Sequence, residues 1–269
     1  MFAMDAGLFR AKPDYARALA TLSAADAGRE EPPLRVVTAA SLFDGHDAAI
    51  NVMRRLIQAA GAEVIHLGHN RSVDDVVRAA AQEDVQGVAV SSYQGGHVEY
   101  FTYLVEQLRA QGRGDIRIYG GGGGVIVPSE IELLHQRGVA HIFSPQDGQR
   151  MGLAQMINSM IEACDVPPHR DGNVDTTALI AGSERDLARA ISAIESNAIS
   201  ATALEELRAA AARRVVPVLG ITGTGGSGKS SLTDEILRRF RLDQNDKVRI
   251  AVIAIDPTRR RGGGALLGD

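Results

Sequence analysis

The amino-acid sequence predicts an α/β protein, with a doubly wound parallel sheet in its first part and a second α/β unit in its last part. From Leu34 onwards, short apolar runs alternate with amphipathic stretches of roughly 12 to 15 residues, which is typical of successive β–α units. Several of the 29 glycines cluster in two places, Gly120–Gly124 and Gly223–Gly228, each after an apolar run. The polar, proline-containing stretch at residues 165–172 indicates a linker between the two parts.

Composition excludes several classes of protein. A chain of 269 residues with 45% hydrophobic and 23% charged residues is long and apolar enough to fold, which excludes disordered and fibrous proteins. The net charge of −4 provides no broad basic field, so we expect no nucleic-acid partner. The single cysteine, Cys164, excludes an internal disulfide framework and a cysteine-rich metal site. No apolar run approaches the roughly 20 residues that cross a bilayer, and no basic-then-apolar leader is present. We therefore expect a cytoplasmic protein without a membrane partner.

Residues 1–33 are expected to form a lead-in, with a helix over Tyr15–Ala27 that ends before Pro32 and Pro33. The first domain is expected over residues 34–164. Its predicted strands are Leu34–Ala40, Ala62–Leu67, Val85–Val90, Ile116–Tyr119 and Ala140–Phe143. Its predicted helices are Asp47–Ala60, Ser72–Glu83, Val98–Gln111, Ser129–Arg137 and Asp147–Cys164. Five such β–α units predict a flavodoxin-like sheet.

The second half of the sequence predicts a linker and the start of another domain. Residues 165–214 are expected to be a linker with helices, the helical region covering roughly Ser183–Arg214. Residues 215–269 predict a buried strand, a helix and a second strand, at Val215–Ile221, Lys229–Phe240 and Val248–Ile255. Two strands and one helix do not close a nucleotide-binding domain, so we expect an incomplete domain here. Residues from about Val215 are then expected to be protease-sensitive, while Leu34–Cys164 resists.

Three loops of the first domain carry residues suited to ligand binding. Asp44-Gly45-His46-Asp47 follows the first predicted strand, Ser91-Ser92-Tyr93 the third and Gly120–Gly124 the fourth. The carboxyl ends of parallel strands lie on one edge of a sheet, so the three loops are expected to converge near the topological switch point. Taken alone, these residues have simpler explanations: His46 as a surface histidine, Asp44-Gly45 as a tight turn and Gly120–Gly124 as a plain glycine connection.

The spacing of these residues resembles a known motif. Between Ala49 and Ser91 lie 41 residues, and between Tyr93 and Gly120 lie 26. This pattern resembles the D-x-H-x-x-G, S-x-L and G-G motif of B12-binding domains in the methylmalonyl-CoA mutase group, over about residues 34–164. Ala49 stands where the motif has Gly, and Tyr93 where it has Leu. The resemblance implies adenosylcobalamin as cofactor.

The resemblance also implies a role for the Asp-x-His pair. His46 is expected to bind cobalt in place of the cofactor's own dimethylbenzimidazole base, since neutral imidazole is a good ligand for this metal. Asp44 lies two residues away and is expected to accept a hydrogen bond from the other ring nitrogen, which fixes the tautomer.

The displaced base and its nucleotide tail need a slot in the domain. Ser91 is expected to offer its hydroxyl to the benzimidazole, with Tyr93 in the same binding set. Gly120 and Gly121 would let the backbone approach the tail without a Cβ in the way. Gly122–Gly124 receive no role from the resemblance.

The second glycine cluster is a phosphate-binding motif. Gly223-Thr224-Gly225-Gly226-Ser227-Gly228-Lys229-Ser230 matches G-x-x-x-x-G-K-[ST] between an apolar run and a predicted helix. Backbone N–H groups of such a loop bind anions at a helix N-terminus, Lys229 neutralises the outer phosphates as a catalytic residue, and the Ser230 hydroxyl binds Mg²⁺. The expected nucleotide-binding residues are Gly223, Gly225, Gly226, Ser227, Gly228, Lys229, Ser230 and Ser231.

The last residues resemble the switch region of the MeaB-type metallochaperone GTPases. Asp256 ends the second predicted strand, and Gly262–Gly264 lead towards Asp269. The resemblance implies that Asp256 and Asp269 bind Mg²⁺ and that Asp256 takes part in catalysis, although Asp256 also fits a simple turn cap. It further implies GTP as the nucleotide.

The order of the two parts resembles the family of fused isobutyryl-CoA mutases. That resemblance implies adenosylcobalamin-dependent interconversion of isobutyryl-CoA and n-butyryl-CoA, with the acyl-CoA held by a barrel domain. It also implies a homodimeric parent and a cobalamin-delivering adenosyltransferase. A corrinoid carrier or sensor, an NTP-driven chaperone, and a mutase for another acyl-CoA such as methylmalonyl-CoA remain alternatives. We expect the 269-residue chain by itself to bind cobalamin without mutase activity, since the barrel is absent from it.

Overall fold

The structure is a computed structural model that describes residues 34–165 and 174–253. The predicted lead-in helix Tyr15–Ala27 and the two aspartates Asp256 and Asp269 lie outside the described residues. The chain divides into two compact units between Ala212 and Arg213, and each is described by itself.

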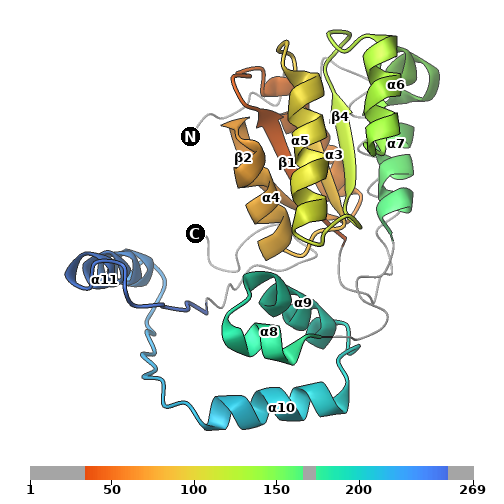
Figure 1. The fold of residues 1–269 in the computed structure, drawn as a ribbon. Coiled ribbons are helices and arrows are strands. Elements are labelled where there is room, and N and C mark those ends of the chain that lie inside the picture. The colour runs from red at the N-terminus through yellow and green to blue at the C-terminus, as the bar shows by residue number, and fades with distance from the viewer. Residues whose placement is uncertain (1–33, 166–173, 254–269) are drawn as a thin grey trace. The chain divides into compact units, whose positions relative to one another are not determined.

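The first unit is built on a five-stranded parallel sheet in the order β2-β1-β3-β4-β5 (Figure 1). This is the flavodoxin-like order, so the predicted fold class is confirmed, with its switch point between β1 and β3. Each strand overlaps a predicted one and differs from it by a few residues at the ends. The strands are β1 Arg35–Ser41, β2 Glu63–Arg71, β3 Gly87–Ser91, β4 Arg117–Gly121 and β5 His141–Phe143.

Five helices cover the two faces of the sheet (Figure 1). One apolar core joins a sheet face to α4 Val73–Gln82, α5 His97–Ala110 and α6 Pro128–Arg137. A second core joins the other face to α3 Ala48–Ala59 and α7 Pro145–Cys164. Because apolar residues cover both faces, the central strands β1 and β3 are mostly apolar and do not alternate.

The sequence predicts one regular helix over Asp147–Cys164, but the observed helix α7 is interrupted. Gly152 has φ 74° and ψ 164°, which breaks the helical path inside it. A glycine adopts this conformation without strain, so the chain makes the break at the residue that tolerates it. The start of α7 is fixed by a capping box, in which Ser144 and Asp147 each accept a hydrogen bond from the other's backbone N–H.

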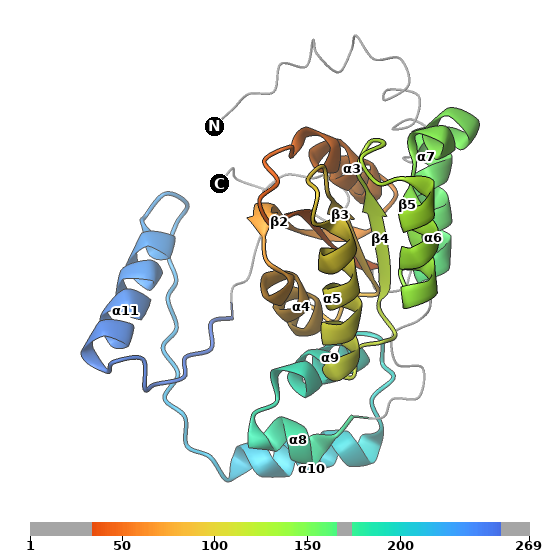
Figure 2. The same cartoon turned by 45° about the horizontal axis from the view of Figure 1, so that its top comes forward.

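The stretch predicted as a linker with helices contains α8 Thr176–Ala181, α9 Glu184–Glu195 and α10 Ala201–Ala212, of which α8 precedes the predicted helical region. Helix α9 packs against α4, below the sheet in Figure 2. Arg35, at the start of β1, donates to Ser192 at 3.2 Å and to Glu195 at 2.6 Å. This segment is therefore joined to the amino edge of the sheet by specific polar contacts.

In the second unit the structure contains helix α11, Lys229–Asp243, where a helix is predicted. The predicted strands Val215–Ile221 and Val248–Ile255 are wrong as far as the structure describes them: residues 215–221 and 248–253 form no strand. Val215 is 100% and Val218 92% exposed. A strand is stabilised by hydrogen bonds to a neighbouring strand, and the described part of this unit offers none. An apolar run alone therefore does not make a strand.

In the part of the chain that the structure describes, no helix has the length and apolar character needed to span a membrane.

Candidate functional site

The Asp44 carboxylate joins two loops at the carboxyl edge of the sheet. It is buried, and its Oδ1 accepts a hydrogen bond from the His46 backbone N–H at 2.8 Å and lies 2.9 Å from His46 Nδ1. Its Oδ2 accepts from the Tyr93 backbone N–H at 2.6 Å. One side chain thus connects the loop after β1 to the loop after β3.

The His46 side chain is 77% exposed, while its partner Asp44 is fully buried. When Nδ1 donates its hydrogen to the carboxylate, the lone pair of a neutral imidazole lies on Nε2. Asp44 therefore orients the imidazole ring through Nδ1, so that Nε2 can act as a ligand. The Tyr93 ring lies beside it, with 5.7 Å between ring centroids, and burial followed by the Asp44 charge raises the pKa of the Tyr93 phenol.

Asn70, at the end of β2, also holds the loop that carries Asp44. Its Oδ1 accepts from the Phe43 backbone N–H at 2.8 Å, and its own backbone N–H donates to the Asp44 carbonyl at 3.3 Å. The residue has a φ of 55°, which asparagine tolerates better than most residues. Sequence reasoning missed Asn70, because its partners lie 26 and 27 residues away along the chain.

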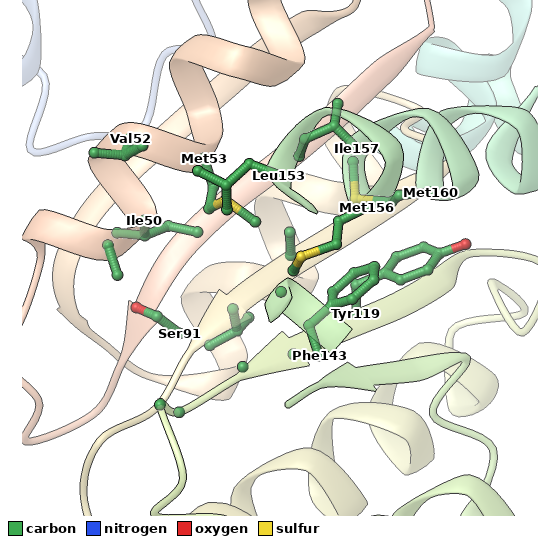
Figure 3. Close-up of a pocket in the computed structure, with 18 of the residues that line it drawn as sticks. Ile50, Val52, Met53, Ser91, Tyr119, Phe143, Leu153, Met156, Ile157 and Met160 are labelled. Atoms are coloured by element: carbon green, nitrogen blue, oxygen red, sulfur yellow. The ribbon is translucent and has the colours of Figure 1, made fainter. Parts of the chain in front are cut away.

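A cavity of about 480 Å³ lies next to this loop, between the sheet and helices α3 and α7. Figure 3 shows apolar side chains from both helices and from β4 and β5 pointing into it. Ser91, Tyr93 and Gly120–Gly123 line it from the strand ends. The apolar lining comes from Ile50, Val52, Met53, Tyr119, Phe143, Leu153, Met156, Ile157 and Met160. Such a cavity fits a flat aromatic group.

The Ser91 hydroxyl is a buried polar group in the lining of this cavity. It is buried and has no hydrogen-bond partner among the described residues. The neighbouring Ser92 differs, because its Oγ accepts a hydrogen bond from Ser41 Oγ at 2.9 Å. Buried hydroxyls are rarely left unpaired, so a partnerless one in a cavity indicates a polar ligand atom. The oriented imidazole, the apolar cavity and this hydroxyl together fit the cobalamin that the sequence predicts.

Gly120 and Gly121 line the cavity, but a side chain on Gly120 would meet the core first. A Cβ there would lie 2.5 Å from both Ile142 Cδ1 and Phe101 Cζ. A Cβ on Gly121 would lie 3.4 Å from the Phe143 carbonyl oxygen. Close packing inside the domain thus requires glycine at Gly120.

The glycines without an expected role bring the loops after β3 and β4 together. A Cβ on Gly122 would lie 2.2 Å from the Ser92 carbonyl oxygen, and one on Gly123 would lie 2.5 Å from the Tyr93 ring. Gly123 and Gly124 also have φ values of 58° and 99°, a backbone region that favours glycine. Gly122 and Gly123 therefore shape the cavity wall, which sequence reasoning missed.

The buried His97 joins the ends of the loops that follow β3 and β4. His97 lies 2.9 Å from Glu130 Oε2 through Nε2 and 3.0 Å from the Gln94 carbonyl through Nδ1. The Val127 backbone N–H and then His97 lower the pKa of Glu130, since both favour the carboxylate. This contact joins the start of α5 to the start of α6.

The glycine-rich motif Gly223–Ser230 leads into the first turn of α11. Lys229 begins the helix, and its Nζ donates to the Thr224 carbonyl at 2.8 Å. Gly226 and Gly228 have φ values of 73° and 80°, which the turn into the helix requires. Ser230 and Ser231 follow in the first helical turn, where free N–H groups favour anions.

Comparisons with known proteins define the class. Residues 34–154 match the family model described as "B12 binding domain", and residues 187–269 match "Methylmalonyl Co-A mutase-associated GTPase MeaB". The "2-hydroxyisobutanoyl-CoA mutase small subunit" of Aquincola tertiaricarbonis is 31% identical over 134 residues, which are 50% of this chain and 96% of that subunit. The chain belongs to the B12-binding family of acyl-CoA mutases.

Within that family, the fused enzymes are similar over most of the chain. The "Fused isobutyryl-CoA mutase" of Nocardia farcinica is 62% identical over 247 residues, which are 91% of this chain and 23% of that protein. That of Cupriavidus metallidurans is 61% identical over 236 residues, 88% of this chain and 22% of that protein. The predicted resemblance to fused isobutyryl-CoA mutases is thus confirmed, and the chain spans less than a quarter of the length of these two relatives.

These matches assign cobalamin to the first unit and GTP to the C-terminal part. The MeaB match begins at residue 187, within α9. Helices α9 and α10 therefore belong by sequence to the GTPase part, although α9 packs against the cobalamin-binding unit.

Proposed function

We propose that this chain supplies the cobalamin-binding and GTPase parts of an adenosylcobalamin-dependent mutase that interconverts isobutyryl-CoA and n-butyryl-CoA. One observation supports it above the others: the buried Asp44 carboxylate orients the exposed His46 imidazole next to an apolar cavity that contains the partnerless Ser91 hydroxyl. The names and domain order of the fused relatives support the substrate class. When bound, adenosylcobalamin supplies radical chemistry through homolysis of its cobalt–carbon bond.

The residues of the first unit bind and orient the cofactor. His46 Nε2 binds cobalt, and Asp44 keeps the proton on Nδ1 and makes the ring a better donor. Ser91 hydrogen-bonds the displaced benzimidazole inside the cavity. Tyr93 and Gly121 contribute the wall of the slot.

The residues of the second unit bind GTP. Lys229 neutralises the outer phosphates, and the backbone N–H groups of the loop hold them. Ser230 binds Mg²⁺ together with Asp256 and Asp269. GTP hydrolysis then controls cofactor loading and protects the radical chemistry.

The partners follow from the same proposal. Acyl-CoA is held over the cofactor by a separate substrate-binding domain, in a homodimeric enzyme that an adenosyltransferase supplies with cobalamin. The small-subunit relative supports a cobalamin-binding part that works with another mutase part. We place this activity in the cytoplasm.

The cobalt ligand can be tested directly. The chain is loaded with cob(II)alamin after ¹⁵N-histidine labelling, and the nitrogen splitting of its EPR spectrum is measured. A splitting that changes with ¹⁵N-histidine and disappears in His46→Ala supports the proposal. A splitting that follows ¹⁵N-labelled dimethylbenzimidazole contradicts it.

The reaction is tested on the full-length parent protein. Incubation with adenosylcobalamin and isobutyryl-CoA should give n-butyryl-CoA by chromatography, with cobalamin uptake that depends on GTP. Turnover of methylmalonyl-CoA alone would show a mutase for another substrate. Cobalamin binding without turnover of any acyl-CoA would show a carrier or sensor.

A further inference from the structure

Phe43 is an outlier in both exposure and backbone conformation. Its exposure of 83% is the highest of the large hydrophobic residues described in the first unit, where the next, Ile191, reaches 50%. Its φ is 65°, in the left-handed region that bulky residues avoid. An aromatic ring is thus kept in water on a strained backbone.

Neither the turn nor the core explains this aromatic ring. The turn is formed by backbone bonds, from the Phe43 N–H to Asn70 and from the Asp44 N–H to the Ser41 carbonyl at 3.0 Å. Glycine or asparagine would make the same bonds with less strain. The exposed ring contributes little apolar burial to the fold. Strain that persists without benefit to folding is typical of functional positions.

The position of Phe43 indicates what its ring contacts. The residue lies directly before Asp44 and three residues before His46, on the loop that presents the imidazole. Its direct neighbours Leu42 and Asp44 are half-buried and buried, whereas Gly45 and His46 further along the loop and the facing polar Asn70 are exposed. A lone aromatic ring in polar surroundings suits a flat ligand better than an apolar protein surface.

We infer that the Phe43 ring packs against the corrin macrocycle of a cobalamin bound through His46. This inference rests on the proposed function. A macrocycle bound through its central metal lies across the metal–nitrogen bond, so it extends over neighbouring residues of the same loop. Tyr93 flanks the imidazole from the loop after β3, and Phe43 precedes it in the loop after β1. Phe43 therefore adds an aromatic contact that covers apolar macrocycle surface.

The experiment measures cob(II)alamin affinity of the 269-residue chain by absorbance titration. Phe43→Ala should weaken binding about tenfold, the effect expected when roughly half of an aromatic side chain loses its burial, and Phe43→Leu should lie in between. Tyr103→Ala removes another exposed aromatic, on α5, and should leave the dissociation constant unchanged. Phe43→Gly should bind as weakly as Phe43→Ala but raise the melting temperature of the ligand-free chain by about 2 to 4 °C, because the strain is released.

The EPR splitting from the histidine nitrogen distinguishes a direct contact between Phe43 and the macrocycle from an indirect effect through the position of His46. If it persists in Phe43→Ala while affinity falls, the ring acts on the macrocycle and the inference holds. If Phe43→Ala keeps wild-type affinity, as expected when another protein surface covers the ring, the inference is wrong. Loss of the histidine splitting in Phe43→Ala would also overturn it, since the residue would then act through His46. A wild-type chain that binds no cobalamin contradicts the proposed function itself.

Discussion

Ser91→Ala should change stability and cofactor affinity in opposite directions. The Ser91 hydroxyl is buried without a partner among the described residues and lies in the wall of the 480 Å³ cavity. In the ligand-free chain this hydroxyl is shielded from bulk water and receives no hydrogen bond from the described residues. Removing it should therefore stabilise the ligand-free chain and remove a contact from the bound cofactor.

The magnitude follows from the cost of an unpaired hydroxyl. Burying such a group without a partner costs about 1 to 3 kcal/mol, so we expect Ser91→Ala to raise the free energy of unfolding by about 1 kcal/mol. For a domain of this size that is a rise of about 2 to 4 °C in melting temperature. A net hydrogen bond of about 0.5 to 1.5 kcal/mol predicts an affinity for cobalamin about 2- to 12-fold weaker.

The neighbouring serine provides a matched control. In the wild-type chain Ser41 Oγ donates to the Ser92 hydroxyl at 2.9 Å. Ser92→Ala removes this buried partner of Ser41 and should therefore lower the melting temperature. Differential scanning calorimetry and cobalamin titration of both variants make the comparison. A fall in melting temperature for Ser91→Ala similar to that for Ser92→Ala would refute the reasoning, because it would mean that the Ser91 hydroxyl has a partner in the folded state.

Three further predictions follow from the same structure. Lys229→Ala in the full-length protein should weaken GTP binding by about 10- to 100-fold in calorimetric titration and leave cobalamin affinity unchanged; equal losses at both sites would contradict separate domains. Gly122→Ala places a Cβ 2.2 Å from a backbone oxygen, so it should destabilise the chain by about 2 kcal/mol in urea and weaken cobalamin binding, whereas Gly95→Ala, whose Cβ meets nothing within 4 Å, should do neither. The Ser144 backbone N–H lowers the pKa of Asp147 below its usual 3.8, so its stabilisation is complete above that value and lost as the pH falls through the lowered pKa. The melting temperature of Asp147→Asn should accordingly fall less between about pH 5 and pH 3 than that of the wild type, and parallel curves would contradict this.

The first domain could be predicted because its signals are local. Each β–α unit shows itself as an apolar run followed by an amphipathic stretch, and the observed strands differ from the predicted ones by a few residues. Asp44 and His46 lie two residues apart, so a short pattern is enough to predict their contact at 2.9 Å. The phosphate loop is likewise contained within eight consecutive residues, Gly223–Ser230.

The rest depends on contacts between distant residues. Asn70 and Glu130 act on Phe43 and His97 across 27 and 33 residues, and a single sequence gives no sign of such pairs. Gly122 looks redundant until the Ser92 carbonyl is seen beside it. The strand predicted at Val215–Ile221 is wrong because a strand forms only with a neighbour, which apolar periodicity does not reveal.

Helix α9 packs at one edge of the sheet, and the candidate cofactor site lies at the opposite edge. Arg35 opens β1, Gln82 closes α4, and Gln111 follows α5; these are the residues that bond Glu195, Glu184 and Arg185 of α9. The opposite ends of β1 and β3 lead to Asp44, His46 and Tyr93. Helix α9 thus occupies one rim of the domain, while the His46 imidazole lies at the opposite rim and is exposed. The packing of α9 and the exposure of the imidazole therefore do not compete for the same surface.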